Sequence, residues 1–192
     1  PAHITAATGV DALTHLVEAY LAKGFHPMCD GIALEGIRLI KKHLVNAVKN
    51  PTSVEDRAGM LCASMMGATA FQKGLGAIHA LSHPLGAMYH THHGTTNAVV
   101  MLPVLRSNRP AIETRISAAA DYLGIDGGFD GFYDFVAALI AQLEIPPNLT
   151  ALGVTDPDVD AVVRAALTDP SAGGNPVEMT YDNTKSLLQS CL

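Results

Sequence analysis

The sequence predicts an all-α fold, a bundle of helices joined by short loops. Hydrophobic residues make up 48% of the 192 residues but aromatic residues only 5%, so the core must be built mainly from Ala, Leu, Val, Ile and Met. Ala, Leu and Met are strong helix formers. Apolar residues recur at helical spacing between Gly and Pro. Alternating Val, Ile and Thr runs with flanking hairpin turns, which would indicate strands, are nearly absent.

The first two helices are delimited by capping and helix-breaking residues. We expect the first from Val10 to Ala22, with Thr8 as its N-cap and Gly24 just past its end. We expect the second from Cys29 to Val48, because the chain reaches Pro51 soon afterwards and proline cannot continue a helix.

The third helix has a clear N-terminal signal. Ser53 is followed three residues later by Asp56, which is a capping-box pattern, and the helix should continue toward Gly74. Small residues recur in it near helical spacing, so we expect close packing and burial. These residues are Gly59, Ala63, Gly67 and Ala70.

The remaining helices are punctuated by proline. The stretch from His79 to Leu102 should be helical but interrupted, because Pro84 lacks an amide donor and should start or kink a turn. Thr155, Pro157 and Asp158 form a good helix start. The later helices are expected at Ala111–Leu123, Phe129–Leu143, Pro157–Leu167 and Tyr181–Gln189.

Charge and cysteine content exclude several classes of protein. The net charge is −6, and the densest basic pair is Lys41-Lys42, so a nucleic-acid partner is not supported. Three cysteines without paired spacing indicate neither a disulfide framework nor a cysteine zinc site, and they fit a reducing, cytoplasmic compartment. Apolar runs are interrupted before they could span a bilayer, so no membrane partner is expected.

The candidate functional residues are histidines and one aspartate. Five of the nine histidines lie between His79 and His93. Asp11 and His15 are four residues apart, as are His79 and His83, so each pair shares one helix face. His93 follows a turn. The neighbours of these residues along the chain are mostly apolar.

Polar side chains on an apolar face need partners, because burying them unpaired costs a few kcal/mol each. A metal ion would satisfy several at once, and a carboxylate with imidazoles suits Fe²⁺ or Zn²⁺. Two plainer interpretations stay open. Asp11 and His15 could be a simple hydrogen-bonded pair, and His90, His92 and His93 could form a solvated loop. The Gly74–Gly76 segment is not a dinucleotide fingerprint, because a third glycine is missing and no strand precedes it.

Three segments resemble signatures of the group III, iron-containing alcohol dehydrogenases. They are GVDALTHLVEAY at 9–20, GAIHALSHPLGA at 76–87, and HGTTNA at 93–98 followed by Leu102-Pro103. With the Asn175-Pro176 turn, the resemblance covers nearly the whole chain. It implies that the metal ligands are Asp11, His15, His79 and His93 and that His83 has a catalytic, proton-handling role. Asp11 also separates the chain from the related maleylacetate reductases, which depart at that position.

The resemblance further implies a fold and partners. The chain, residues 1–192, would be the single all-helical, metal-binding domain of a dehydroquinate synthase-like, two-domain enzyme. It opens at Pro1 and not at Met, so we expect a fragment. The α/β domain that binds NAD or NADP in the family would be missing, leaving an apolar docking patch through which a homo-oligomer could also form.

The implied reaction is the reversible oxidation of a small alcohol to an aldehyde or ketone. A divalent metal, with Fe²⁺ favoured and Zn²⁺ as the alternative, would polarise the substrate oxygen while hydride passes to or from the nicotinamide. Two other functions remain open: a metal-dependent hydrolase that uses the same ligands, and a helical module with a structural metal. The first would need a carboxylate base besides Asp11. The second would more often use cysteine ligands.

Overall fold

The computed structural model describes residues 1–192 and contains helices only, which confirms the expected all-α class. Eight α-helices and two short 3-10 helices follow one another without a strand. They are α1 (Ala2–Leu21), α2 (Pro27–Lys49), α3 (Val54–Ala70), η1 (Phe71–Lys73), α4 (Ala77–Tyr89), α5 (His93–Leu123), α6 (Gly128–Gln142), α7 (Val159–Thr168), η2 (Pro170–Gly174) and α8 (Tyr181–Gln189).

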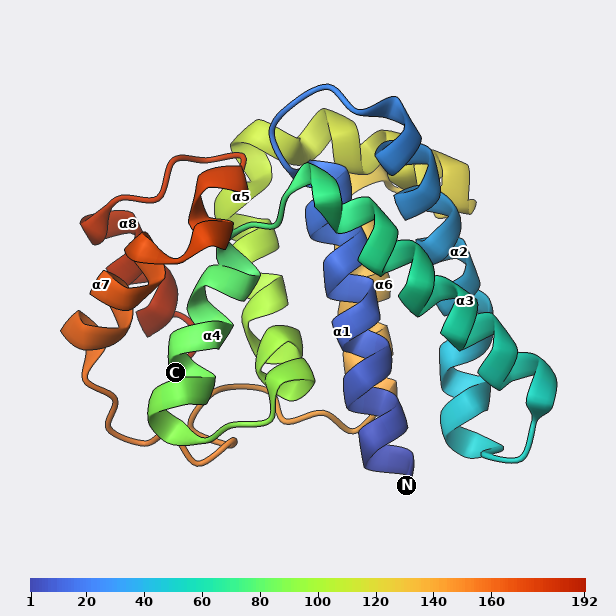
Figure 1. The fold of residues 1–192 in the computed structure, drawn as a ribbon, viewed down its shortest axis with the longest axis horizontal. Coiled ribbons are helices and arrows are strands. Elements are labelled where there is room, and N and C mark those ends of the chain that lie inside the picture. Colours follow the sequence, from blue (N-terminus) through green and yellow to red (C-terminus); the bar gives the residue numbers. More distant parts are fainter.

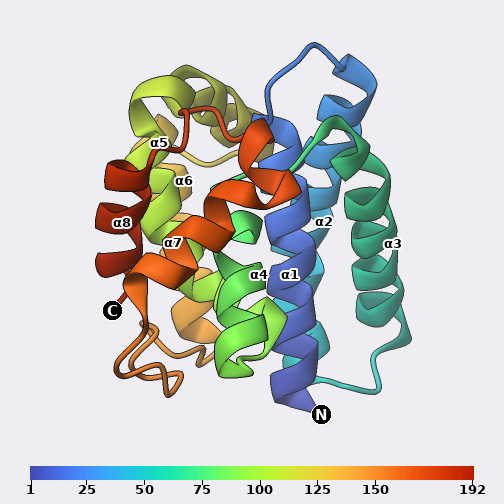
Figure 2. The same ribbon diagram turned by 60° about the vertical axis from the view of Figure 1, so that its left-hand side comes forward.

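Helix α1 lies in the middle of the molecule (Figures 1 and 2). Helices α2 and α3 pack on one side of it, and α5 packs on the other side together with α4, α7 and α8. Most of the residues of α1 are buried. None of the helices combines the length and the apolar character that a transmembrane span requires.

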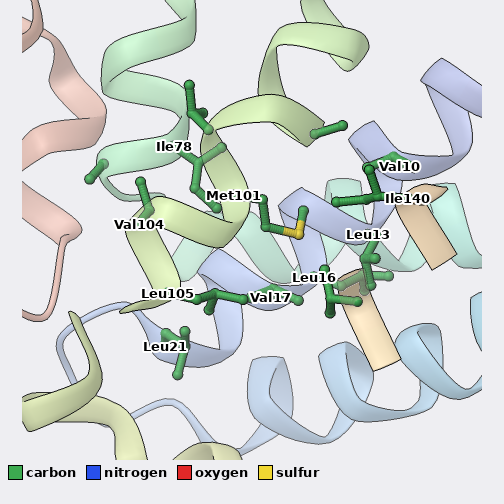
Figure 3. Packing of buried hydrophobic residues seen from close by; sticks show 14 of the residues in the cluster. Val10, Leu13, Leu16, Val17, Leu21, Ile78, Met101, Val104, Leu105 and Ile140 are labelled. Atoms are coloured by element: carbon green, nitrogen blue, oxygen red, sulfur yellow. The ribbon is translucent and has the colours of Figure 1, made fainter. Parts of the chain in front are cut away.

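The core is one continuous cluster of 45 buried hydrophobic residues. Figure 3 shows its centre, where side chains of α1 meet those of α4, α5 and α6. Because Leu13 and Leu16 are fully buried, the rotation of α1 about its axis is fixed by packing. The labelled contributors are Val10, Leu13, Leu16, Val17 and Leu21 of α1 with Ile78, Met101, Val104, Leu105 and Ile140.

One expected helix start is confirmed, one is shifted, since α7 begins at Val159 and not at Pro157, and one is wrong. The side chain of Ser53 accepts a hydrogen bond from the amide of Asp56, and that of Asp158 accepts one from Ala161. Thr8, however, is not an N-cap. Helix α1 begins at Ala2, and the Thr8 hydroxyl donates back to the carbonyl of Ile4 at 2.8 Å. No glycine or proline precedes Thr8 within the helix, so nothing stops the helix from extending toward its first residue.

The expected interruption at Pro84 is also wrong. Pro84 lies inside α4, and the break falls at residues 90–92, where His90 adopts a left-handed conformation with φ 56°. Helix α5 likewise continues through Pro103 and Pro110, so no separate helix begins at Ala111. A proline removes one backbone hydrogen bond, and here the packing of buried residues on both sides outweighs that loss.

The expected burial of α3 is only half right. Its small residues do allow close packing, since a Cβ on Gly67 would lie 3.2 Å from the Cβ of His15. The opposite face is open, with Leu61 72% and Met65 66% exposed. Small residues at helical spacing therefore predicted a closely packed face, which meets α2 at Gly59 and α1 at Gly67, but not that the other face would stay uncovered.

At Gly94 helix α5 approaches α1 closely, and this contact allows a test of the packing between the two helices. A Cβ on Gly94 would overlap the backbone carbonyl of Ala7, which cannot move without shifting α1. We therefore expect Gly94→Ala to lower the free energy of unfolding by roughly 1–3 kcal/mol, as overpacking does. Urea denaturation measures this.

The matched control is Gly31→Ala in α2. A Cβ there would meet no atom within 4 Å, and Gly31 is exposed. Alanine should therefore stabilise the helix by about 0.5–1 kcal/mol relative to glycine. Equal denaturation midpoints for the two variants would contradict the close approach of α1 and α5.

Candidate metal centre

Helix α1 presents a polar stripe on an otherwise apolar helix. Asp11, His15 and Glu18 follow at intervals of four and three residues, so their side chains lie on one face. The apolar residues of α1 are packed in the core. Because the apolar and the polar side chains belong to one rigid helix, this packing also holds the polar stripe in its orientation toward α4 and α5.

Helix α4 adds His79 to this stripe. Asp11, His15 and His79 each offer one ligand atom, and these atoms all lie within 4.8 Å of one another. The His15 and His79 rings are stacked with centroids 4.7 Å apart. His79 is buried, with 1% of its side chain exposed, whereas Asp11 retains 24%.

His93 completes the group from the first turn of α5. Its Nε2 lies 3.3 Å from Asp11 Oδ1, and its ring centroid lies 5.3 Å from that of His79. The structure thus brings together the four residues that the family resemblance implies as metal ligands. It places His93 against Asp11, unlike His90 and His92, which are exposed. Because its side chain is 41% exposed, the cluster opens to the surface on the His93 side.

Asn97, one turn beyond His93 on α5, was missed by the sequence analysis. Its Nδ2 lies 2.7 Å from Asp11 Oδ1, 3.3 Å from His79 Nε2 and 3.1 Å from His93 Nε2. One amide group with two hydrogens faces three atoms that can each accept. Its own Oδ1 is buried without a partner. The lone pairs that converge here therefore exceed the donors available, which is the arrangement that a cation satisfies.

Burial and mutual interactions shift the pKa values of Asp11, His15 and His93. Burial alone would raise the pKa of Asp11, but its interactions with His93 and His15 outweigh burial and hold that pKa below its ordinary value. Burial lowers the pKa of His15, partly offset by Asp11. The interaction with Asp11 raises the pKa of His93 against the effect of burial. An ionised carboxylate beside neutral His15 is a suitable donor pair for a divalent metal.

Glu18 is a second residue that the sequence analysis did not assign. It is 5% exposed, and its Oε2 lies 2.6 Å from His79 Nδ1. Its other oxygen accepts a hydrogen bond from the amide of Ile78 at 2.7 Å. The signal was available in the sequence, because Glu18 lies two turns after Asp11 on the same helix face.

His83 lies beside the cluster at its open side. Its ring centroid is 5.6 Å from that of His79 and 5.5 Å from that of His93, and 44% of its side chain is exposed. Its Nδ1 bonds to Asp169 Oδ2 at 2.8 Å. A hydrogen bond to a carbonyl freed by Pro84 would have indicated a purely structural role, but the ring is instead held by a carboxylate 86 residues away in the chain.

Asp169 is held in turn by the backbone. It caps η2, where its Oδ1 accepts from the amide of Ser171 at 2.8 Å. Burial raises the pKa of Asp169, yet the hydrogen bonds from Ser171 and His83 lower it further than burial raises it. The carboxylate is therefore a fixed, ionised partner for His83.

The chain is similar to proteins of one enzyme family. Residues 5–192 match the sequence model of the Fe-containing alcohol dehydrogenase family, C-terminal. The chain is 38% identical to a 4-hydroxybutyrate dehydrogenase from Cupriavidus necator, over 100% of this chain and 52% of the relative.

Solved structures agree with this match. A crystal structure of a 1,3-propanediol oxidoreductase superposes with a TM-score of 0.95 at 34% identity, covering 100% of this chain and 52% of the other. A sulfoacetaldehyde reductase from Bifidobacterium kashiwanohense, in complex with NAD+, superposes with a TM-score of 0.90 at 29% identity, covering 100% and 50%. The chain spans about half the length of these relatives. It belongs to the Fe-containing alcohol dehydrogenase family, and it corresponds to the helical C-terminal part of that family.

Proposed function

We propose that Asp11, His15, His79 and His93 bind one divalent metal ion and that this chain is the metal-binding part of an NAD(P)-dependent alcohol dehydrogenase. The observation that carries the proposal is the convergence of ligand atoms around Asn97 Nδ2. A metal bound there would supply Lewis acidity toward the substrate oxygen, and a nicotinamide would supply the hydride chemistry. One carboxylate and three imidazoles suit Fe²⁺ or Zn²⁺, and the family favours iron.

The relatives support a class of substrate and a cofactor. The names of the relatives describe dehydrogenation or reduction of small compounds that carry a hydroxyl or aldehyde group, such as 4-hydroxybutyrate and 1,3-propanediol. We therefore infer a small alcohol or aldehyde substrate. The reductase solved with NAD+ supports a nicotinamide cofactor. None of the chain's glycine-rich segments is a dinucleotide loop, so the nucleotide is assigned to a part of the enzyme outside residues 1–192.

His83 is suited to move the proton of the substrate hydroxyl. It lies at the open side of the cluster and is substantially exposed, so a substrate or a water molecule can reach it. Because Asp169 binds its Nδ1, the ring is fixed and its Nε2 is left for exchange.

Two other functions are less well supported. A hydrolase would need a free carboxylate base near the metal, but Glu18 is committed to Ile78 and His79, and Asp169 is committed to Ser171 and His83. A structural metal site would be closed, whereas this cluster opens to the surface at His93 and His83.

The ligand assignment predicts the effect of His15→Ala. Removing a direct ligand should weaken Zn²⁺ affinity by roughly 100-fold or more, since it should matter at least as much as residues that only orient ligands. Competition with a chromophoric chelator measures this. His92→Ala is the matched control, because the His92 side chain is exposed and bonds only to Thr95. If both variants retained the affinity of the unsubstituted chain, the assignment would be wrong.

The proton-handling role predicts the effect of His83→Ala in a protein that joins this chain to its nucleotide-binding domain. Metal content should stay normal while kcat falls by roughly 10²- to 10⁴-fold, the range typical of a lost acid–base group. Metal analysis and steady-state kinetics on the same sample separate the outcomes. Loss of metal together with activity would make His83 a ligand, and normal turnover would leave it no chemical role.

The assignment of the nucleotide to another part of the enzyme predicts that residues 1–192 alone do not bind NADH appreciably. Isothermal titration calorimetry with this chain should therefore show no saturable heat. Zn²⁺ titrated into the same sample is the positive control, because the four metal ligands all lie within the chain. Saturable NADH binding in the micromolar range would contradict the assignment.

A further inference from the structure

We infer that Glu18 is a positioning residue that holds His79 in its Nδ1–H tautomer and so turns the Nε2 lone pair toward the metal. This inference rests on the proposed metal site and adds a residue to it. Glu18 itself touches neither metal nor substrate and acts through His79.

The two oxygens of Glu18 have two different partners. Oε2 lies 2.6 Å from His79 Nδ1, and Oε1 accepts from the Ile78 amide at 2.7 Å. Both side chains are buried, with 5% of Glu18 and 1% of His79 exposed. A carboxylate oxygen accepts, so the imidazole proton lies on Nδ1. The Nε2 that faces Asp11 and Asn97 therefore carries the lone pair.

The start of α4 explains how a buried carboxylate is tolerated here. The N-cap, Gly76, has no side chain to accept the first amide hydrogens of the helix. Asn175 Oδ1 accepts from Ala77 at 3.1 Å instead, and Glu18 accepts from Ile78. The N-terminus of a helix stabilises negative charge, so α4 stabilises the carboxylate that orients its own histidine.

Glycine at position 76 is part of this arrangement. A Cβ there would lie 3.0 Å from both Glu18 Oε1 and Asn175 Oδ1, which is tighter than ordinary contact. The absence of a side chain therefore lets both acceptors reach the helix end. Glu18 in turn is on α1, the helix that carries Asp11 and His15, so one rigid element fixes three of the four proposed ligands.

A glutamine at position 18 would not replace the carboxylate. The site offers two donors, the Ile78 amide and His79 Nδ1–H, and a side-chain amide has one acceptor oxygen. If that oxygen keeps Ile78, the NH₂ group faces Nδ1 and favours the opposite tautomer, with the proton on Nε2. That proton would block metal binding at His79. Glu18→Gln thus preserves size and one helix-capping bond while reversing the tautomer preference.

The experiment compares Glu18→Gln with Asp56→Asn. Asp56 Oδ1 lies 2.9 Å from Nδ1 of the buried His43, so the second variant makes the same carboxylate-to-amide change in a similar carboxylate–histidine pair outside the cluster. We expect Glu18→Gln to weaken Zn²⁺ affinity by roughly 10- to 100-fold, as loss of a residue that orients a metal-binding histidine does. Asp56→Asn should leave Zn²⁺ affinity unchanged.

A spectroscopic readout separates positioning from helix capping. The ¹⁵N imidazole shifts of His79 in the metal-free chain, recorded above the pKa of an ordinary histidine, should show the Nδ1–H tautomer. In Glu18→Gln they should show the Nε2–H tautomer. An Nε2–H tautomer in the unsubstituted chain would overturn the inference even if the variant did not fold. Unchanged Zn²⁺ affinity with lower thermal stability would also overturn it, because Glu18 would then only cap α4.

The same data distinguish this inference from the proposed function. A chain whose His79 changes tautomer on Glu18→Gln but which binds no Zn²⁺ would support the orienting role of Glu18 and overturn the metal site. A chain that binds Zn²⁺ equally well in both forms, with His79 unaltered, would leave the metal site standing and remove Glu18 from it.

Discussion

The tight packing of α1 is the constraint on which the rest of the structure depends. Its apolar residues fill the centre of the core, and its polar stripe supplies Asp11, His15 and Glu18. Both sets of side chains belong to one helix, so a rotation of α1 that improved the packing of the apolar side chains would displace the polar ones. Glycines keep the neighbouring helices close, at Gly94 on α5 and Gly67 on α3. The geometry of the cluster is therefore set by core packing and not by the cluster itself.

Buried amides and carboxylates then join segments that are far apart in the sequence. Asn108 of α5 and Asn175 near the C-terminus bond to each other in both directions, at 2.8 and 2.9 Å. Asn175 also reaches the first amide of α4. The C-terminal segment thus fixes the start of α4 from one side while α1 fixes it from the other. Among the buried side-chain nitrogens and oxygens, Asn97 Oδ1 inside the cluster is left without a partner, whereas Arg115 Nη2 pairs with Asp30 Oδ2 at 2.8 Å.

The sequence predicted what helical spacing determines and missed what only tertiary packing determines. The pairs Asp11/His15 and His79/His83 could be placed on shared faces because four residues complete about one turn. Asp169 could not be predicted, since 86 residues separate it from His83 and no periodicity links them. The proline rule failed at Pro84 because it describes an isolated helix, whereas Pro84, Ser82 and Leu85 are buried against the rest of the molecule and α4 stays continuous. The family motifs supplied the four ligand candidates together, which spacing alone could not.

His79 and His83 show how the environment separates two residues with identical local signals. Both lie on one face of α4, and each has its Nδ1 held by a carboxylate, Glu18 in one case and Asp169 in the other. They differ in burial, at 1% and 44% exposed. A buried imidazole with a fixed tautomer is suited to hold a metal, because its lone pair has a constant direction and little competition from water. A half-exposed imidazole with the same kind of anchor is suited to exchange protons, because solvent and substrate can reach it. Burial, which no spacing rule reports, thus gives these two histidines of α4 different environments, and the proposed roles of His79 and His83 follow that difference.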